Sequence, residues 1–208
     1  MAQTTSNYTQ QALAARSLFL QWDQAAMIAK YGLKADETYL YLFFVGAQYR
    51  IHRRTGQVDR DFNGSFQECL GFEEVMSLYD LLCRENQPFL SGEYCSIYSL
   101  PNVVLSSGLG QNIFTDAAKW FQGNSQKLRQ ACLALGGTSL PGSADAAFQI
   151  PVFPFFPVIL QFWDGDEEFD PQLTLLWDKN TQQFFRYETT YYLAGHLLKR
   201  LRELASQT

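Results

Sequence analysis

The sequence has no apolar run long enough to cross a bilayer. The segment most similar to such a run, residues 151–163, is interrupted by three prolines and one glutamine. A membrane-spanning helix needs about 20 consecutive apolar residues. The first residues, MAQTTSNYTQQALAARSLFLQW, also lack the basic stretch, pure apolar segment and small-residue cleavage site of a secretion signal. We therefore expect a soluble, cytoplasmic protein with no membrane partner.

Positive charge is also in short supply. The chain has 16 Lys and Arg against 21 Asp and Glu, which gives a net charge of −5. Because binding to DNA or RNA depends on a basic surface that neutralises phosphates, we expect no nucleic-acid partner. With 47% hydrophobic and only 18% charged residues, the chain is not intrinsically disordered. Its 208 residues fit a single domain, 1–208, with an ordered core over 8–204.

Residues that hold metals or activate nucleophiles are scarce. The two histidines, His52 and His196, have no cysteine or acid within four positions. The four cysteines are widely spaced and form no CxxC pair, the spacing typical of structural zinc sites and iron–sulfur clusters. Hydrolase, zinc-protease and dinucleotide-binding motifs are absent as well. We expect reduced, mostly buried cysteines, no metal and no cofactor, and the sequence identifies no catalytic residue.

Hydrophobic periodicity predicts an α+β fold. Helices at both ends and strands clustered over 39–58 and 146–187 indicate a mostly antiparallel sheet with helices packed on one face. The expected helices cover residues 8–30, 65–83, 115–121, 125–135 and 189–204, the second starting at a capping box formed by Ser65 and Glu68. The expected strands are a hairpin over 39–54, a short strand at 94–98, and a C-terminal meander of AAFQIPVF, VILQFW, LTLLWD and QFFRYE. Residues 106–112, rich in Gly and Ser, indicate an exposed connection, and prolines 151, 154 and 157 predict a bent or edge strand.

The densest polar segment places five carboxylates within residues 164–170. A solvated hairpin turn, in which Asp164-Gly165 supplies a positive φ, is the simplest interpretation. The same charges could instead attract a basic partner or hold a divalent cation, although the spacing does not match an EF-hand. A metal-dependent hydrolase that uses this acidic turn is therefore the alternative function.

Aromatic residues make up 15% of the chain. Most of these rings are expected in the core, but alternate rings of a meander can face outward and stack on a flat ligand. One interpretation is therefore a ring-lined pocket with Arg186 and Glu188 at its rim. The candidate ligand-binding residues, from the acidic turn and the aromatic set together, are Tyr94, Trp163, Asp164, Asp166, Glu168, Asp170, Trp177, Arg186 and Tyr187.

The segment PVFPFFPVILQFWDGDEEFDPQLTLLWD, residues 151–178, follows a Gly-Glu-Tyr segment at 92–94 and LALGG at 133–137. In this order the chain resembles a prokaryotic family known only as a domain of unknown function. Members of that family often have glycines after the Leu-Pro matched by Leu100-Pro101, where this chain has Asn102-Val103-Val104.

The resemblance implies no established activity. Relatives occur in anaerobic bacteria and archaea, and some are fused to or associated with iron–sulfur and corrinoid-linked proteins. The resemblance therefore implies an accessory role in one-carbon metabolism, in which any cluster belongs to a partner. We expect a binding or accessory module that recognises a partner protein or a small flat ligand.

Overall fold

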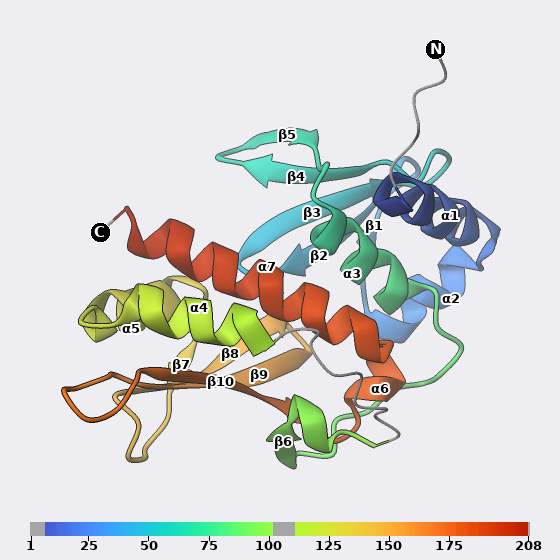
Figure 1. Ribbon diagram of the computed structural model, residues 1–208. Helices are drawn as coiled ribbons and strands as arrows, with labels where there is room; N and C mark the ends of the chain where they lie inside the picture. The colour runs from blue at the N-terminus through green and yellow to red at the C-terminus, as the bar shows by residue number, and fades with distance from the viewer. Residues whose placement is uncertain (1–6, 102–110, 208) are drawn as a thin grey trace.

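The computed structural model describes residues 7–101 and 111–207. It confirms the α+β class, with the strands divided between two antiparallel sheets. The first sheet has the strand order β1-β2-β3-β4-β5 and the second has the order β6-β10-β9-β8-β7. Helix α7 lies between the two sheets, so each sheet has helices on one of its faces (Figure 1).

The first sheet consists of β1 (Lys34–Ala35), β2 (Tyr39–Phe44), β3 (Ala47–His52), β4 (Val58–Phe62) and β5 (Ser65–Glu68). The second consists of β6 (Tyr94–Ser96), β7 (Thr138–Ser139), β8 (Ala146–Phe153), β9 (Phe156–Trp163) and β10 (Gln172–Asp178). The helices are α1 (Asn7–Gln21), α2 (Gln24–Tyr31), α3 (Phe72–Leu82), α4 (Gln111–Phe121), α5 (Ser125–Ala134), α6 (Thr181–Phe184) and α7 (Tyr187–Ala205), with a 3-10 turn at Ile97–Ser99.

The early hairpin is confirmed as β2 and β3. Alternate residues of β2 point inward, and the two-residue turn at Val45-Gly46 has positive φ at both positions, 41° and 70°, as the twist of a tight hairpin requires. The Val45 N–H donates to the Val152 carbonyl at 2.8 Å. This bond joins the two sheets where β2 meets β8.

The helix expected from Ser65 is wrong in its first third, because residues 65–68 form strand β5. The Asn63-Gly64 pair has positive φ at both positions, 54° and 88°, and connects β4 to β5 as a type I′ turn. Ser65 and Glu68, the expected capping box, therefore pair with β4 as part of a strand, and α3 begins after Gly71.

The N-terminal helix is divided in two at Asp23. The Asp23 carboxylate accepts hydrogen bonds from the backbone N–H groups of Ala25 and Ala26 at 2.9 and 3.1 Å, so it caps a new helix, α2. Gly32 ends α2 with φ of 60°, as expected.

The last expected strand, QFFRYE, is also wrong, because α6 and the start of α7 occupy these residues. The Thr181 hydroxyl donates to the Asp178 carbonyl and starts a short helical turn directly after β10. The three earlier strands of the meander are confirmed. The bend expected at the prolines is the Pro154 turn between β8 and β9, and Pro151 lies beyond the part of β8 that pairs with β7. Within the loop expected at 106–112, residues 106–110 lie outside the described residues, and α4 begins at Gln111.

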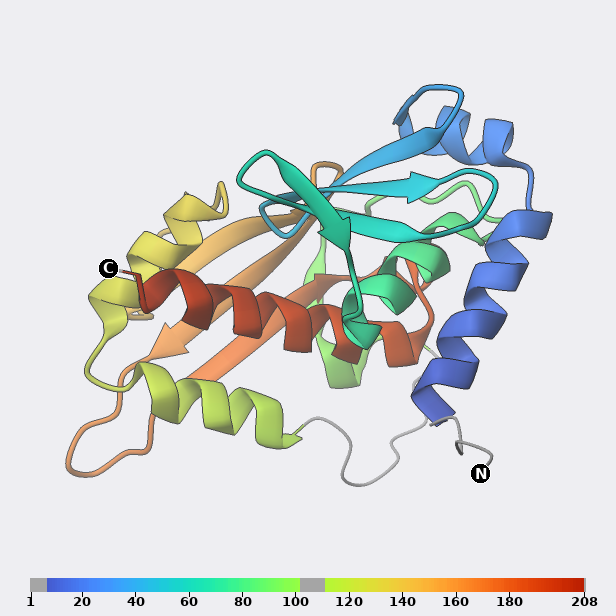
Figure 2. The same ribbon diagram turned by 90° about the horizontal axis from the view of Figure 1, so that it is seen from above.

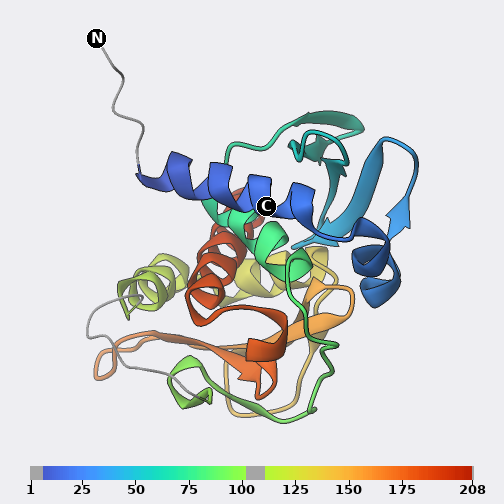
Figure 3. The same ribbon diagram turned by 90° about the vertical axis from the view of Figure 1, so that its right-hand side faces the viewer.

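The core fills the space between the sheets. Helix α7 buries Leu193, Leu197 and Leu201 and packs against α3 and α5, while α4 and α5 pack against β10 and β8. Seen from above, the connection from β5 to α3 passes over α7 (Figure 2). Helix α1 packs along α3 at the side of the molecule (Figure 3). Within the described ranges, no helix combines the length and apolar character needed to span a membrane.

Candidate functional site

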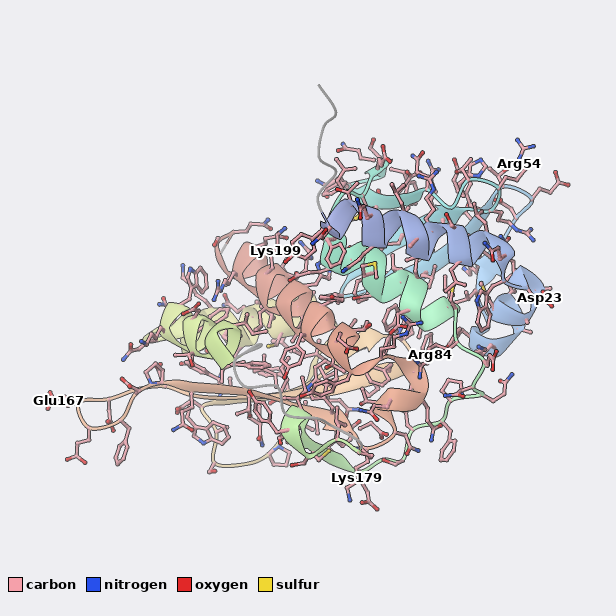
Figure 4. The ribbon with its side chains drawn as sticks, turned by 45° about the vertical axis from the view of Figure 1, so that its right-hand side comes forward. Asp23, Arg54, Arg84, Glu167, Lys179 and Lys199 are labelled. Atoms are coloured by element: carbon pink, nitrogen blue, oxygen red, sulfur yellow. The ribbon has the colours of Figure 1, made fainter. Side chains whose placement is uncertain are left out.

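The acidic turn extends from the body of the protein, with Glu167 at its tip (Figure 4). Asp166 Oδ1 accepts the backbone N–H groups of Glu168 and Phe169, both at 2.8 Å, and these bonds lower the pKa of Asp166. Asp164 Oδ1 accepts the Gly123 N–H at 2.8 Å. These carboxylates thus organise backbone, and Glu168 and Asp170 are exposed. In the described part of the chain, no three His, Cys, Asp or Glu side chains are grouped so that they could hold a metal ion, so the hydrolase alternative has no ligand set there.

Gly165 does not have the positive φ expected of it. A Cβ at this position would instead lie 2.7 Å from Pro171 Cδ and 2.8 Å from Gln122 Nε2. The glycine is required because the backbone of the acidic turn closely approaches these two residues.

The other predicted residues of the second sheet do not join the acidic turn. Trp163 is half-buried and pairs with Gln172 at the start of β10, whereas Tyr94 pairs with Asp178 at its end. Trp177 is completely buried. The expected surface of Tyr94, Trp163 and Trp177 is therefore not one site.

The Asp178 side chain holds the Gly-Glu-Tyr segment, residues 92–94, in place. Its buried carboxylate accepts the backbone N–H groups of Ser91 and Gly92 at 3.0 and 2.8 Å. The role of these residues is thus to attach the segment before β6 to the end of β10.

Arg186 and Glu188 both line a cleft between α1, α3 and α7, and not a ring-lined pocket of the meander. This α1–α3–α7 cleft has a volume of about 430 Å³. Its lining is Gln11, Ala14, Ala15, Leu18, Met76, Tyr79, Asp80, Cys83, Arg186, Glu188, Thr189 and Tyr192. Tyr187 is not part of it, and its hydroxyl lies 3.0 Å from that of Tyr191.

Asp80 of α3 determines where α7 begins. Its Oδ2 accepts the Arg186 backbone N–H at 2.7 Å and the Thr189 hydroxyl at 2.6 Å, and its Oδ1 lies 3.4 Å from Arg186 Nε. The buried carboxylate satisfies an N-terminal donor of α7 that has no partner within the helix. It also holds Arg186 at the rim of the cleft.

A second group of buried polar side chains joins α3 and α7 to the first sheet. Glu74 Oε1 accepts the Tyr49 hydroxyl at 2.5 Å and lies 3.1 Å from Arg60 Nη1. His196 Nε2 lies 3.4 Å from the Tyr49 oxygen and 3.8 Å from Glu74 Oε1. We call these four residues the Glu74 cluster.

The Glu74 cluster holds one negative and one positive charge. Burial lowers the pKa of His196 to about 3, and the nearby Arg60, Arg200 and Lys199 add to this shift, so the imidazole is neutral. Since the single Tyr49 proton goes to Glu74, a hydrogen bond between Tyr49 and His196 requires the proton on His196 Nε2. Burial and Glu74 also raise the pKa of the adjacent Cys69 thiol to about 12, which makes it a poor nucleophile.

A column of nearly parallel rings forms a third feature. Tyr31 stacks on Phe155 at 4.9 Å and 16°, Phe155 on Phe153 at 5.7 Å and 13°, and Phe153 on Phe44 at 4.6 Å and 15°. The outer end of the column lines a hollow of about 410 Å³ where the two sheets meet. We call it the aromatic hollow, and its lining is Tyr31, Gly32, Leu33, Lys34, Tyr41, Leu42, Phe43, Gln48, Phe153, Pro154 and Phe155.

Residues 23–200 match the family model described as Domain of unknown function (DUF3786). The chain belongs to this family. No curated protein and no solved structure matches it. All residues that line the aromatic hollow lie within the range of the DUF3786 match, whereas α1, which forms one wall of the cleft, precedes it. Asn102-Val103-Val104, where the sequence departs from the expected glycines, lies outside the described residues.

Sequence reasoning missed the Glu74 cluster, Asp80 and Tyr31. The available signal was the mostly apolar helix FEEVMSLYDLL, in which Glu74 and Asp80 are buried acids that each contact a residue of α7 or its N-terminus. The misplaced start of α3 concealed this pattern.

Proposed function

We propose that this DUF3786 chain is a binding module for a small flat ligand, and that the aromatic hollow is its binding site. The observation that carries the proposal is the ring column, whose outer members Tyr31 and Phe155 line an open hollow instead of ending in the core. Its volume lies within the range of small-molecule sites, roughly 300–1,000 Å³.

Rings from three parts of the chain line the aromatic hollow. Tyr31 ends α2, Tyr41 and Phe43 lie on β2, and Phe153 and Phe155 come from the end of β8 and the turn after it. The Tyr31 hydroxyl donates to the Leu81 carbonyl at 3.0 Å, which fixes the orientation of its ring. Pre-oriented rings can stack on a planar ligand in offset geometry with little loss of side-chain entropy.

The charged residue that lines the aromatic hollow indicates what kind of charged group the ligand carries. Lys34 is its charged lining residue, and the other polar side chains are tyrosines and Gln48. Within the described residues Lys34 forms no ion pair. In a chain with a net charge of −5, a hollow lined by a lysine and no acid favours a planar ring that carries an anionic group.

The proposal includes the accessory role that the family resemblance implies, beside a partner protein of anaerobic one-carbon or corrinoid metabolism that contributes any iron–sulfur cluster. It also includes a reducing, cytoplasmic setting. The four free cysteines, of which Cys83 and Cys132 are buried, support that setting.

Two fluorescent probes test the site, 8-anilinonaphthalene-1-sulfonate and N-phenyl-1-naphthylamine, which share their rings but differ in the sulfonate. We expect Phe155→Leu to weaken both probes about tenfold, because the hollow loses a lining ring and Tyr31 loses the ring on which it stacks. Lys34→Gln should weaken the sulfonate alone, by about threefold at low salt. Lys127→Gln on α5, an exposed control, should change neither affinity.

The proposal is wrong if Phe155→Leu, with its thermal melting unchanged, binds both probes as the wild type does. It is also wrong in its ligand class if Lys34→Gln weakens both probes equally. Native mass spectrometry of anaerobically purified protein would then identify any retained ligand by its added mass.

A further inference from the structure

The α1–α3–α7 cleft is separate from the aromatic hollow and shares no lining residue with it. We propose that this cleft is a second binding site, and that it takes a small zwitterion with an apolar body, such as an α-amino acid with an apolar side chain. The proposal goes beyond the flat-ligand function and does not depend on it.

Part of the lining of the cleft is apolar. On α1, Ala14 and Ala15 face the cleft, and because their side chains are small they leave room between α1 and α3. Leu18 and Met76 complete this surface. An aliphatic side chain placed here would leave water and contact carbon, which the hydrophobic effect favours.

The rim of the cleft presents one cation and one anion. The Arg186 side chain is 62% exposed, and its contact with Asp80 is made through Nε, at 3.4 Å. Its two Nη groups can therefore receive a carboxylate in a bidentate manner. Glu188, two residues further along α7, is exposed on the same cleft and can accept an ammonium group.

The remaining polar groups fix this arrangement without adding a competing free charge. Both oxygens of Asp80 are occupied by Arg186 and Thr189. Burial raises the pKa of the Cys83 thiol to about 12, so the thiol is neutral, and burial also raises the pKa of the Tyr79 hydroxyl. The charged lining residues, Asp80, Arg186 and Glu188, sum to −1, which disfavours a ligand that carries a carboxylate alone.

Calorimetric titration with three ligands of one shape tests the assignment: L-leucine, 4-methylpentanoate, which lacks the ammonium, and 3-methylbutylamine, which lacks the carboxylate. We expect L-leucine to bind at least about tenfold tighter than either analogue, because each analogue forms only one of the two charged contacts with the rim.

Three variants locate the site. Ala15→Leu should abolish L-leucine binding by filling the space beside α1. Arg186→Gln and Glu188→Gln should each weaken it about tenfold, since each removes one charged contact. Arg186→Gln preserves the start of α7, because Asp80 accepts the backbone N–H of residue 186 and the Thr189 hydroxyl.

Matched controls come from exposed residues that do not line the cleft. Arg54→Gln, whose side chain points into solvent at the far end of the first sheet (Figure 4), and Glu85→Gln should bind L-leucine as the wild type does. Phe155→Leu should also have no effect, which separates this site from the aromatic hollow.

The inference is overturned if L-leucine does not bind, if Ala15→Leu binds it unchanged, or if either analogue binds as tightly as L-leucine. A loss of binding in Glu85→Gln equal to that in Glu188→Gln would also overturn it, because the effect would then reflect net charge. Circular dichroism and thermal melting establish that each variant is folded.

Discussion

The acidic turn and the interface between α3 and α7 use carboxylates in opposite ways. In the turn, Asp166 accepts backbone N–H groups within its own loop, and Glu167 extends into solvent. In the interface, Glu74 and Asp80 are buried and hold groups from other elements, Arg60 on β4 and the first residues of α7. The sequence shows the first group as a conspicuous cluster, whereas the second belongs to a mostly apolar helix, in which Asp80 lies six residues after Glu74.

The density of charged residues along the chain is thus a poor guide to how much each of them contributes to the free energy of unfolding. Exposed like charges cost little, because water and salt screen them, and they also contribute little. A buried carboxylate is destabilising unless it is fully hydrogen-bonded, so each partner of Glu74 and Asp80 is needed. The predictions below test this contrast.

Glu74→Ala should have the largest effect. It leaves the Arg60 guanidinium and the Tyr49 hydroxyl buried without their partner, and Arg60 Nε already has none among the described residues. We expect the free energy of unfolding to fall by about 3–5 kcal/mol, measured by urea denaturation, with one transition if the chain is a single domain. A loss below about 1 kcal/mol would show that the contacts of Glu74 contribute little to the stability of the folded protein.

Asp80→Ala should cost about 2 kcal/mol, because α7 loses its N-terminal acceptor and the Thr189 hydroxyl loses its partner. Amide hydrogen exchange should show the loss of protection concentrated in the first turn of α7. Uniform loss of protection across the protein would contradict a local capping role.

The neutral His196 predicts a pH dependence. Its folded pKa of about 3 lies below the unfolded value of 6.5, so the unfolded chain binds a proton that the folded chain does not. Its contribution is therefore complete above pH 6.5 and is lost as the pH falls from 6.5 towards 3, by up to about 1.4 kcal/mol per pH unit. Urea midpoints between pH 7.5 and 5 should fall more steeply for wild type than for His196→Gln, which cannot take up this proton. Parallel curves would contradict the assignment.

Gly165→Ala should cost about 1 kcal/mol, because its Cβ would lie 2.7 Å from Pro171 Cδ and the turn must shift. The double variant Gly165→Ala with Gln122→Gly, which removes one of the close contacts, should recover part of the loss. No recovery would mean that Pro171 alone, or the backbone conformation, requires the glycine.

The sequence predicted those elements whose signals are local. The β2–β3 hairpin, α4, α5 and the three meander strands follow from periodicity and turn residues, and Gly32 ends its helix as expected. The failures at Ser65 and at QFFRYE have one cause. Each local pattern was compatible with two structures, and a tertiary contact decided between them, strand pairing with β4 in the first case and the Asp80 cap in the second.

The candidate site was harder to predict for the same reason. Arg186 and Glu188 are only two residues apart in the chain, so both reach the α1–α3–α7 cleft although the sequence assigned them to a strand. Tyr31 and Phe155 are far apart in the chain and meet only because α2 ends beside the turn between β8 and β9. The sequence around each residue gives no sign of that contact, so the aromatic hollow could be identified only from the three-dimensional structure.

Glu167→Gln should have the smallest effect and completes the comparison. Its side chain lies at the tip of the acidic turn and points away from the body of the protein (Figure 4), so its removal should change the free energy of unfolding by less than about 0.5 kcal/mol. Because no group of metal ligands is formed within the described residues, millimolar Ca²⁺ or Mg²⁺ should leave the melting temperature of wild type and variant equal. A concentration-dependent rise that Asp166→Asn abolishes would show that the exposed carboxylates close around a cation. Such a rise is the sign of a bound cation, because ligand binding stabilises the folded state by RT ln(1 + [L]/Kd). The acidic turn would then be a cation-binding site, and its contrast with the α3–α7 interface would fail.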